Sequence, residues 1–112
     1  MPLNWGVVIF GVVELEKLNS NLTFGEALEH LKTGAKVARL GWNGKGMFLA
    51  LVKGNDADYF INSRVFGTGA DGNSEKQMPI LDAIYMKTAD DKLVPWLASQ
   101  TDVLAEDWLV LE

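Results

Sequence analysis

The segment that decides the fold spans residues 41–47 and reads Gly41-Trp42-Asn43-Gly44-Lys45-Gly46-Met47. An Asn-Gly pair between two apolar runs is a strong short-range signal for a β-hairpin, because both central residues of a type I′ turn need positive φ angles. Apolar runs lie on both sides, at residues 37–40 and 48–52. The segment therefore predicts a hairpin whose type I′ turn is centred on Asn43 and Gly44.

The same turn carries an indole, Trp42, and an ammonium group, Lys45. One interpretation is structural: Trp42 closes the hydrophobic core beside the hairpin. The other is functional, because an aromatic face, free backbone N–H groups and a cation in one tight turn can bind a nucleobase and a phosphate together. The residues alone place the structural interpretation first.

Length and composition limit the classes of protein that the chain can be. A length of 112 residues suits one domain, and 48% hydrophobic residues suffice for a globular core. The net charge of −5 argues against a nucleic-acid polymer as the main partner. The chain has no cysteine, which excludes disulfides and thiolate zinc sites, and its single histidine, His30, leaves a Ser-His-Asp relay with one possible base.

The N-terminal segment, residues 4–13, is strongly apolar and rich in β-branched residues, which predicts a strand. It lacks the cationic start and the cleavage site of a signal peptide, and it is too short to span a bilayer. Three placements stay open: inside the sheet, at an oligomer interface, or outside the domain proper. We therefore divide the chain into an apolar extension, residues 1–20, and one domain, residues 21–112.

A helix is predicted after Thr23, because Thr23 and Glu26 have the spacing of a capping box. Apolar residues recur at positions 24, 27, 28 and 31 and form one stripe, and Gly34 ends the helix. His30 lies off this stripe and is expected to face solvent.

Strands are predicted on both sides of the turn and at residues 80–88, 93–96 and 108–111, with a long irregular connection over residues 54–79. Pro95 cannot donate a backbone hydrogen bond, so its strand is expected at an edge. A second cap at Ser99 predicts a short helix, with Leu97 and Val103 spaced as a hydrophobic staple. The expected fold class is α+β: an antiparallel sheet of about five strands packed on one main helix, with a short second helix near the C-terminus.

The segment at residues 47–53 is apolar on both faces. This pattern is typical of a central strand that is covered on both sides. In so small a domain, double cover suggests that the chain forms an oligomer.

Three groups of residues occur in a fixed order along the chain: Thr23-Phe24-Gly25-Glu26-Ala27-Leu28; Val37-Ala38-Arg39 with the segment at residues 41–47; and Trp96, Ser99, Gln100, Asp102, Leu104, Ala105, Asp107 and Trp108. Together they resemble the Thoeris anti-defence 2 family of small phage and prophage proteins. The resemblance covers residues 22–112. Residues 1–20 match nothing associated with the family, and residues 54–79 correspond to its variable part.

The resemblance implies a sponge for an immune signal. Such proteins bind the cyclic ADP-ribose-type (glycocyclic ADP-ribose) nucleotide that a bacterial TIR-domain protein makes, and they hold it without degrading it, so that the defence effector is not activated. Some members also bind cyclic oligonucleotides. The resemblance further implies a homotetramer with ligand sites between protomers, in the cytoplasm of the infected bacterial host. We expect no cofactor and no metal, and neither a nucleic-acid polymer nor a membrane as partner.

The resemblance also transfers candidate ligand-binding or site-supporting residues, to which the turn adds Lys45: Trp42, Asn43, Lys45, Trp96, Gln100, Asp102 and Asp107. Trp42 or Trp96 can stack on adenine, which contributes ~1–3 kcal/mol per base. The amides of Asn43 and Gln100 suit a base edge or ribose hydroxyls. Trp5 is expected to pack, and Trp108 to lie in the core.

The charged candidates have competing structural roles. Asp102 can accept a hydrogen bond from a ribose or an amino group, but it also occupies the capping position of the second helix. Asp107 is as readily structural as functional. The candidate cations for a pyrophosphate are Lys45, Arg39 and Arg64, and of these Lys45 alone lies in a predicted site motif.

Two other classes of function stay open. One is an enzyme that degrades the same cyclic nucleotides, although the sequence offers neither cysteine nor a dense carboxylate cluster for metals. The other is an interaction module that contacts a host protein through its apolar N-terminal segment and its tryptophans.

Overall fold

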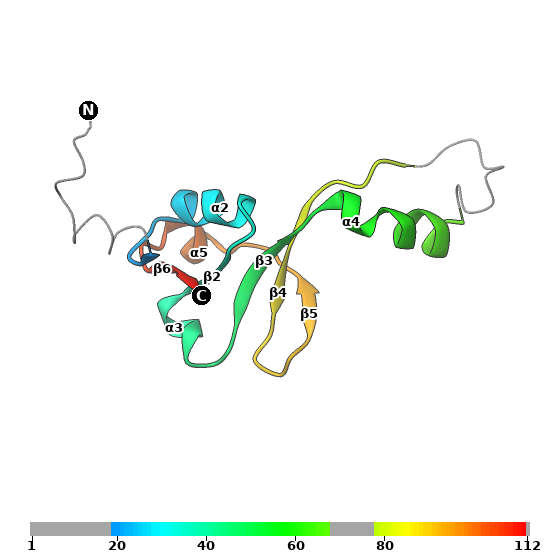
Figure 1. Cartoon of the computed structure of the whole chain (residues 1–112). Coiled ribbons are helices and arrows are strands. Elements are labelled where there is room, and N and C mark those ends of the chain that lie inside the picture. Colours follow the sequence, from blue (N-terminus) through cyan, green and yellow to red (C-terminus); the bar gives the residue numbers. More distant parts are fainter. Residues whose placement is uncertain (1–18, 68–77, 112) are drawn as a thin grey trace, which may run out of the picture.

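A computed structural model describes residues 19–67 and 78–111, and in them five antiparallel strands form one sheet (Figure 1). The strands lie in the order β5-β4-β3-β2-β6, with these bounds: β2 (Lys36–Arg39), β3 (Phe48–Val52), β4 (Ala83–Lys87), β5 (Leu93–Pro95) and β6 (Trp108–Leu111). The predicted α+β class is confirmed. β3 lies in the middle of the sheet, as its apolar sequence predicts, and Pro95 lies on an edge strand, where its missing N–H removes no ladder bond.

Helix α2 (Phe24–Lys32) packs across β2, β3 and β6. The predicted capping box is confirmed: Glu26 N–H donates to the Thr23 hydroxyl, and the Glu26 carboxylate accepts from Thr23 N–H at 2.9 Å. Gly34 follows the helix with a φ of +98°, which suits a glycine. His30, expected to face solvent, is half-buried. The apolar stripe of α2 meets one face of the sheet in a core of Leu22, Ala27, Leu31, Val37, Leu49 and Trp108.

The segment at residues 41–47 joins β2 to β3, which pair in antiparallel register at Val37 and Leu49, but not through the predicted turn. A short helix, α3 (Leu40–Asn43), follows β2, and Gly44 has a φ of −71°. A type I′ turn needs a positive φ at this position, so that prediction is wrong. The reason is that the extra helical turn carries Trp42 inward, where it packs against the core. The positive φ occurs instead at Gly46, at +71°.

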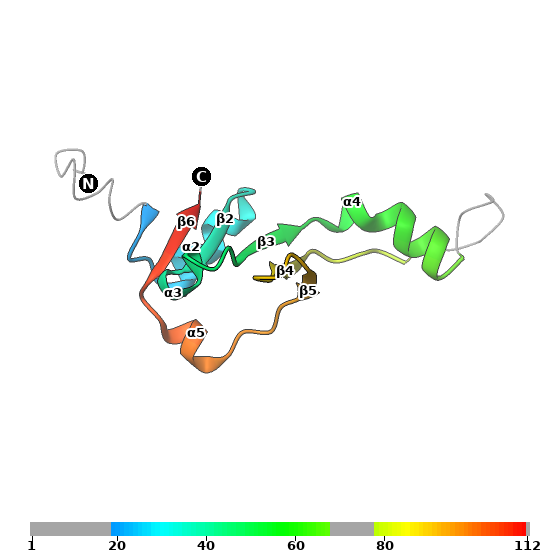
Figure 2. The ribbon, with the colours of Figure 1, turned by 90° about the horizontal axis from the view of Figure 1, so that it is seen from below.

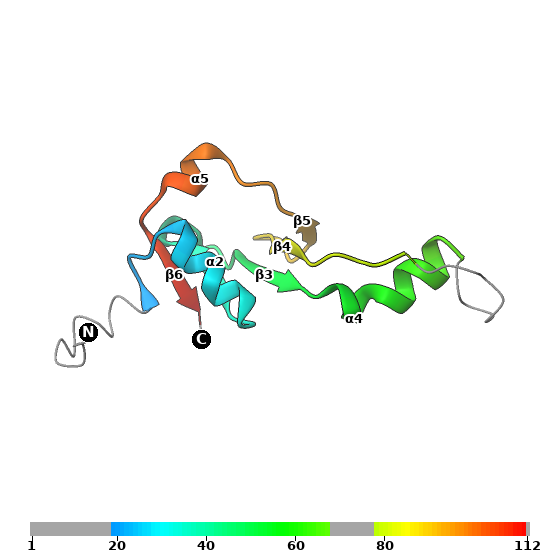
Figure 3. The same ribbon diagram turned by 90° about the horizontal axis from the view of Figure 1, so that it is seen from above.

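The predicted irregular connection is wrong over its first half. Helix α4 (Gly54–Tyr59) runs on into a π-helical turn, η2 (Phe60–Val65), and projects away from the sheet (Figures 1 and 3). Residues 68–77 lie outside the described residues. We call residues 54–67 and 78–82 the arm. The sequence pattern did not predict this helix because the helix has no apolar stripe. Contacts between the two limbs of the arm stabilise it instead.

Two polar contacts join the limbs of the arm. At its base, Gly54 N–H donates to the Asp82 carboxylate at 2.8 Å. Farther out, the fully buried Asn62 donates to the Met78 carbonyl at 2.8 Å and accepts from Met78 N–H at 2.9 Å. The side-chain amide of Asn62 therefore satisfies both backbone groups of Met78, as a neighbouring strand would.

Helix α5 (Gln100–Leu104) confirms the predicted short second helix, with Ser99 as its N-cap. Figure 2 follows the chain from β5, at one edge of the sheet, through α5 to β6 at the other edge. The predicted staple does not form, because Leu97 is 91% exposed. The N-terminal strand predicted at residues 4–13 lies outside the described residues, so the proposed domain division stays a prediction. Within residues 19–67 and 78–111, no helix is long and apolar enough to cross a membrane.

Candidate functional site

Four aromatic side chains meet where α2, α3 and the C-terminal segment converge: Phe24, Trp42, Trp96 and Trp108. Trp108 is fully buried, as predicted, and its Nε1–H donates to the Asp102 carbonyl at 3.0 Å. Trp42 packs edge to face against both other tryptophans, 5.4 Å from Trp108 and 6.4 Å from Trp96 between ring centroids. Trp42 and Trp96 are only half-buried, so this cluster reaches from the core to the surface.

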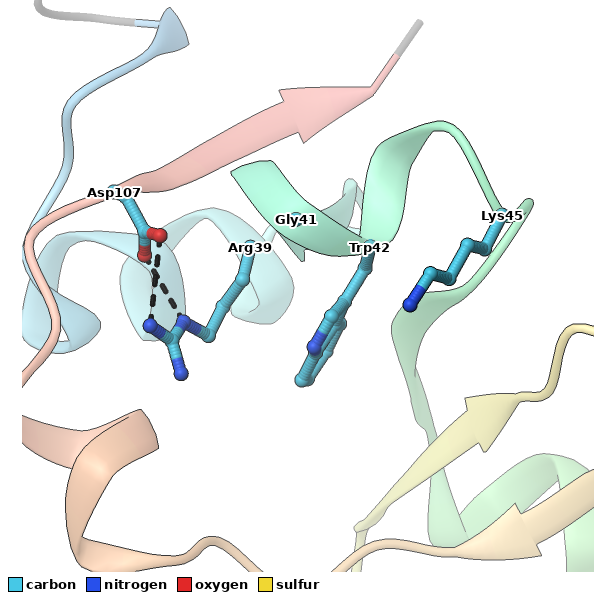
Figure 4. Close-up of a pocket in the computed structure, with 5 residues that line it drawn as sticks. All are labelled: Arg39, Gly41, Trp42, Lys45 and Asp107. Carbon is cyan, nitrogen blue, oxygen red and sulfur yellow. Dashed lines mark hydrogen bonds and ion pairs between the residues drawn. The ribbon is translucent and has the colours of Figure 1, made fainter.

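A cavity of about 290 Å³ opens beside Trp42 and is lined by Arg39, Gly41, Trp42, Lys45 and Asp107. Figure 4 shows the indole of Trp42 between two cations: Lys45 reaches toward the ring from one side, and Arg39 lies on the other and turns toward Asp107. Lys45 is placed there by the turn, because its N–H and that of Met47 both donate to the Trp42 carbonyl, at 2.9 and 3.4 Å.

Arg39 is the centre of the polar side of the cavity. Its Nε and Nη2 donate to the two carboxylate oxygens of Asp107, at 3.0 and 3.5 Å, and its Nη1 donates to Asp102 at 3.0 Å. The hydrogen bonds to Asp107, followed by the one to Asp102, raise the pKa of Arg39 above its ordinary value. The guanidinium thus joins β2 to α5 and to the residue before β6, and it stays charged.

Asp102 has both of its carboxylate oxygens engaged inside the protein. One accepts from Arg39, and the other accepts from Ser99 N–H at 3.2 Å in a capping box. Partial burial on its own would raise the pKa of Asp102. Hydrogen bonds from Ser99 and then from Arg39 outweigh this effect and hold the pKa below its ordinary value. The capping role considered for Asp102 is therefore confirmed, and its side chain is 14% exposed.

The structure brings together three of the predicted site residues, Trp42, Lys45 and Asp107, at one cavity. Two further candidates contact residues that line the cavity. Trp96 packs against the indole of Trp42, and Asp102 forms an ion pair with Arg39.

The other candidates lie elsewhere. Gln100 is the first residue of α5, exposed and not among the residues that line the cavity. Asn43 is the last residue of α3. Arg64, considered as a cation for a pyrophosphate, lies in the arm, where its Cζ is 5.8 Å from the centroid of the Tyr59 ring. The role of Gln100 and Asn43 in binding stays a prediction.

The sequence analysis underestimates the role of Arg39 at the cavity. This residue was a candidate cation outside the predicted site motif, yet it lines the cavity. The available signal was alternation along the strand: Val37 belongs to the core, so Arg39, two residues later, lies on the same face of β2. Its long-range partners, 63 and 68 residues away, leave no local pattern.

The formal charges of the side chains around the cavity balance. Arg39 and Lys45 bring two positive charges, and Asp102 and Asp107 bring two negative ones, within a chain of net charge −5. Because Lys45 is exposed and has no carboxylate partner among the described residues, it is the cation best able to meet an incoming anion. The arrangement can stack a ring, bind an anion and accept hydrogen bonds.

The fold and cavity define a small α+β protein in which an indole between two cations lines a surface cavity. Residues 22–111 match the Thoeris anti-defense 2-like domain, and the chain belongs to this family. It is also similar to Thoeris anti-defense 2 from Bacillus phage SP01, with 46% identity over 100 residues that cover 81% of this chain and 96% of the relative. The resemblance inferred from the motifs is thereby confirmed.

Proposed function

We propose that this protein is a phage counter-defence protein that acts against Thoeris by sequestration. It binds a cyclic ADP-ribose-type nucleotide made by a bacterial TIR-domain protein and holds it, so that the defence effector is not activated. Family membership supports the anti-defence role. The observation that carries the ligand class is the cavity in which Trp42 lies between Arg39 and Lys45.

Each group of such a nucleotide has a counterpart in the cavity. The indole of Trp42 offers a face for adenine, and stacking on it contributes about 1–3 kcal/mol. Lys45 offers an ammonium group to the pyrophosphate. Asp107 keeps a side chain that is 37% exposed, so its carboxylate can accept from a ribose hydroxyl while it holds Arg39. The same groups suit the bases and phosphates of cyclic oligonucleotides.

A homotetramer with sites between protomers would complete this cavity. Its volume of about 290 Å³ is at the lower end of the range for small-molecule sites, whereas the ligand carries a base, ribose rings and a pyrophosphate. The sheet also offers a surface for association. Leu49 points to the core, so its neighbours Phe48 and Ala50 lie on the opposite face, beside Tyr85.

Sequestration without turnover fits the protonation chemistry of the site. The raised pKa of Arg39 and the lowered pKa of Asp102 keep both groups charged at neutral pH, so neither exchanges a proton there. A sponge needs tight binding of the ground state, and nanomolar affinity corresponds to about −12 kcal/mol. An enzyme gains no turnover from such binding. The protein would act in the cytoplasm of the infected host, where the signal is produced.

The test is to mix the protein with a several-fold excess of a cyclic ADP-ribose-type signal, incubate for hours, denature by heat, and analyse the supernatant by chromatography and mass spectrometry. Full recovery of the input, with unaltered mass and retention, is expected. Linear or hydrolysed product beyond one equivalent per site would instead establish an enzyme. A parallel calorimetric titration measures binding. If the protein binds no such nucleotide, the proposal of sequestration is refuted.

A further inference from the structure

Lys87 joins the turn that carries Lys45 to a second, distant turn. It lies at the end of β4, outside the cavity lining, and its Nζ donates to the Gly46 carbonyl at 2.8 Å. The same Nζ pairs with the Asp91 carboxylate at 2.6 Å, in the turn between β4 and β5. One ammonium group therefore ties the turn at residues 44–47, which we call the site turn, to the turn of the β4–β5 hairpin.

The fit between Lys87 and Gly46 is close. Gly46 has a φ of +71°, and a Cβ added there would lie 3.4 Å from the Lys87 Nζ. The positive φ is what favours a glycine at this position, and the added Cβ would make an ordinary van der Waals contact with the ammonium group. The stem of Lys87 lies beside Phe48, its register partner on β3, with Nζ 6.0 Å from the ring centroid, and the side chain is 24% exposed.

The site turn is thereby held from two sides. From inside, the Trp42 carbonyl accepts the N–H groups of Lys45 and Met47. From outside, Lys87 holds the carbonyl of Gly46, the residue that directly follows Lys45. Lys45 itself is exposed, so its own side chain does little to fix its place.

We propose that Lys87 is a positioning residue for the ligand site: it fixes the turn at residues 44–47 so that Lys45 faces the cavity beside Trp42. What the site binds rests on the function proposed above, but the order that Lys87 imposes on the turn does not. A hydrogen bond from a charged donor is strong enough that its loss should weaken binding of an anionic nucleotide about 3- to 10-fold.

Four variants separate this role from general effects. Lys87→Met keeps the stem beside Phe48 and removes the donor, and Lys87→Arg restores a donor. Lys92→Met is the matched control, because it removes the same charge from the same hairpin, where Lys92 pairs with Asp90. Asp91→Asn breaks the ion pair but leaves the bond to Gly46, and asparagine tolerates the Asp91 φ of +64°.

The first measurement needs no ligand. Backbone ¹⁵N relaxation should show that Lys87→Met lowers the heteronuclear NOE at Gly46 and Met47, whereas Lys87→Arg, Lys92→Met and Asp91→Asn leave it near the parent value. Unchanged order of the turn in Lys87→Met would overturn the inference, whatever the protein binds. A parent protein that binds no nucleotide would refute the proposed function and leave this first result to decide on Lys87.

The second measurement is a double-mutant cycle by calorimetry with cyclic ADP-ribose. If Lys87 acts through Lys45, then Lys87→Met should weaken binding in the parent but cause no further loss in the Lys45→Ala background. An equal loss in both backgrounds would show that Lys87 does not act through Lys45, and would overturn the inference.

Discussion

The indoles of Trp42 and Trp108 meet edge to face, with ring centroids 5.4 Å apart and planes inclined by 81°. Trp108 is fully buried, whereas Trp42 is half-buried and lines the cavity. The contact joins the hydrophobic core directly to the candidate site. Packing against the core and availability to a ligand are therefore not exclusive roles for Trp42.

Trp42→Ala should weaken nucleotide binding strongly and also lower the free energy of unfolding by about 2–4 kcal/mol, somewhat less than a fully buried aromatic side chain would cost. Calorimetric titration beside a thermal melt measures both effects. Phe60→Ala removes an aromatic side chain that is 63% exposed on the arm and outside the cavity lining, so it is the control and should change neither. Unchanged affinity together with a large fall in Tm would mean that Trp42 serves the core alone.

Asp102 should make stability depend on pH in the acid range. Its pKa is lower in the folded chain than the ordinary value of 3.8, so its contribution is fully present above that value and is lost as the pH falls through the folded pKa. Asp102→Asn should therefore be less stable than the parent at pH 7, and the difference should shrink below about pH 4. Urea melts across this range test the prediction, and a constant difference would contradict it.

Gly54→Ala should disrupt the base of the arm. A Cβ at this position would lie 1.7 Å from the Ile80 carbonyl oxygen, and backbone cannot move aside as a flexible side chain can. We expect a loss of at least ~1–3 kcal/mol, as in overpacked sites. Gly44→Ala is the matched control, because nothing lies within 4 Å of its added Cβ and its φ is −71°. Equal melting temperatures for the two variants would show that the limbs of the arm do not meet as described.

Removal of residues 1–19 should leave nucleotide affinity within a few-fold of the parent. The family match begins at residue 22. Among the residues that the structure describes, Leu22 is the first in the core, and two backbone hydrogen bonds of 2.9 and 3.1 Å join it to Trp108. Size-exclusion chromatography with light scattering checks the assembly of the shortened chain. Aggregation or a smaller oligomer would indicate that the apolar extension covers a surface of the sheet or an interface.

The elements that the sequence predicts correctly have local causes. Both capping boxes depend on residues three positions apart, so Thr23 and Ser99 mark their helices without any knowledge of the fold. The edge position of Pro95 follows from its missing N–H. The strands follow from short apolar runs between turn residues.

The predictions are wrong where contacts between residues far apart in the sequence determine the local structure. The Asn-Gly signal at Asn43 and Gly44 is local, but burial of Trp42 against Trp108 favours a helical turn there instead. The helix of the arm has no apolar stripe, and it depends on Asn62 reaching Met78 across 16 residues. The same holds for the site: Trp42 and Lys45 are neighbours in the chain, whereas the place of Arg39 is set by Asp102 and Asp107.

The Arg39 ion pairs also set an order in time. On the ribosome, α2, β2 and the Trp42 turn are synthesised well before Asp107, which follows Arg39 by 68 residues. Until the segment at residues 102–108 has been synthesised, the guanidinium lacks its carboxylate partners and Trp42 lacks its contact with Trp108. The cavity lined by Arg39, Trp42 and Asp107 therefore takes shape only after the segment at residues 102–108 has been synthesised and has folded back onto β2.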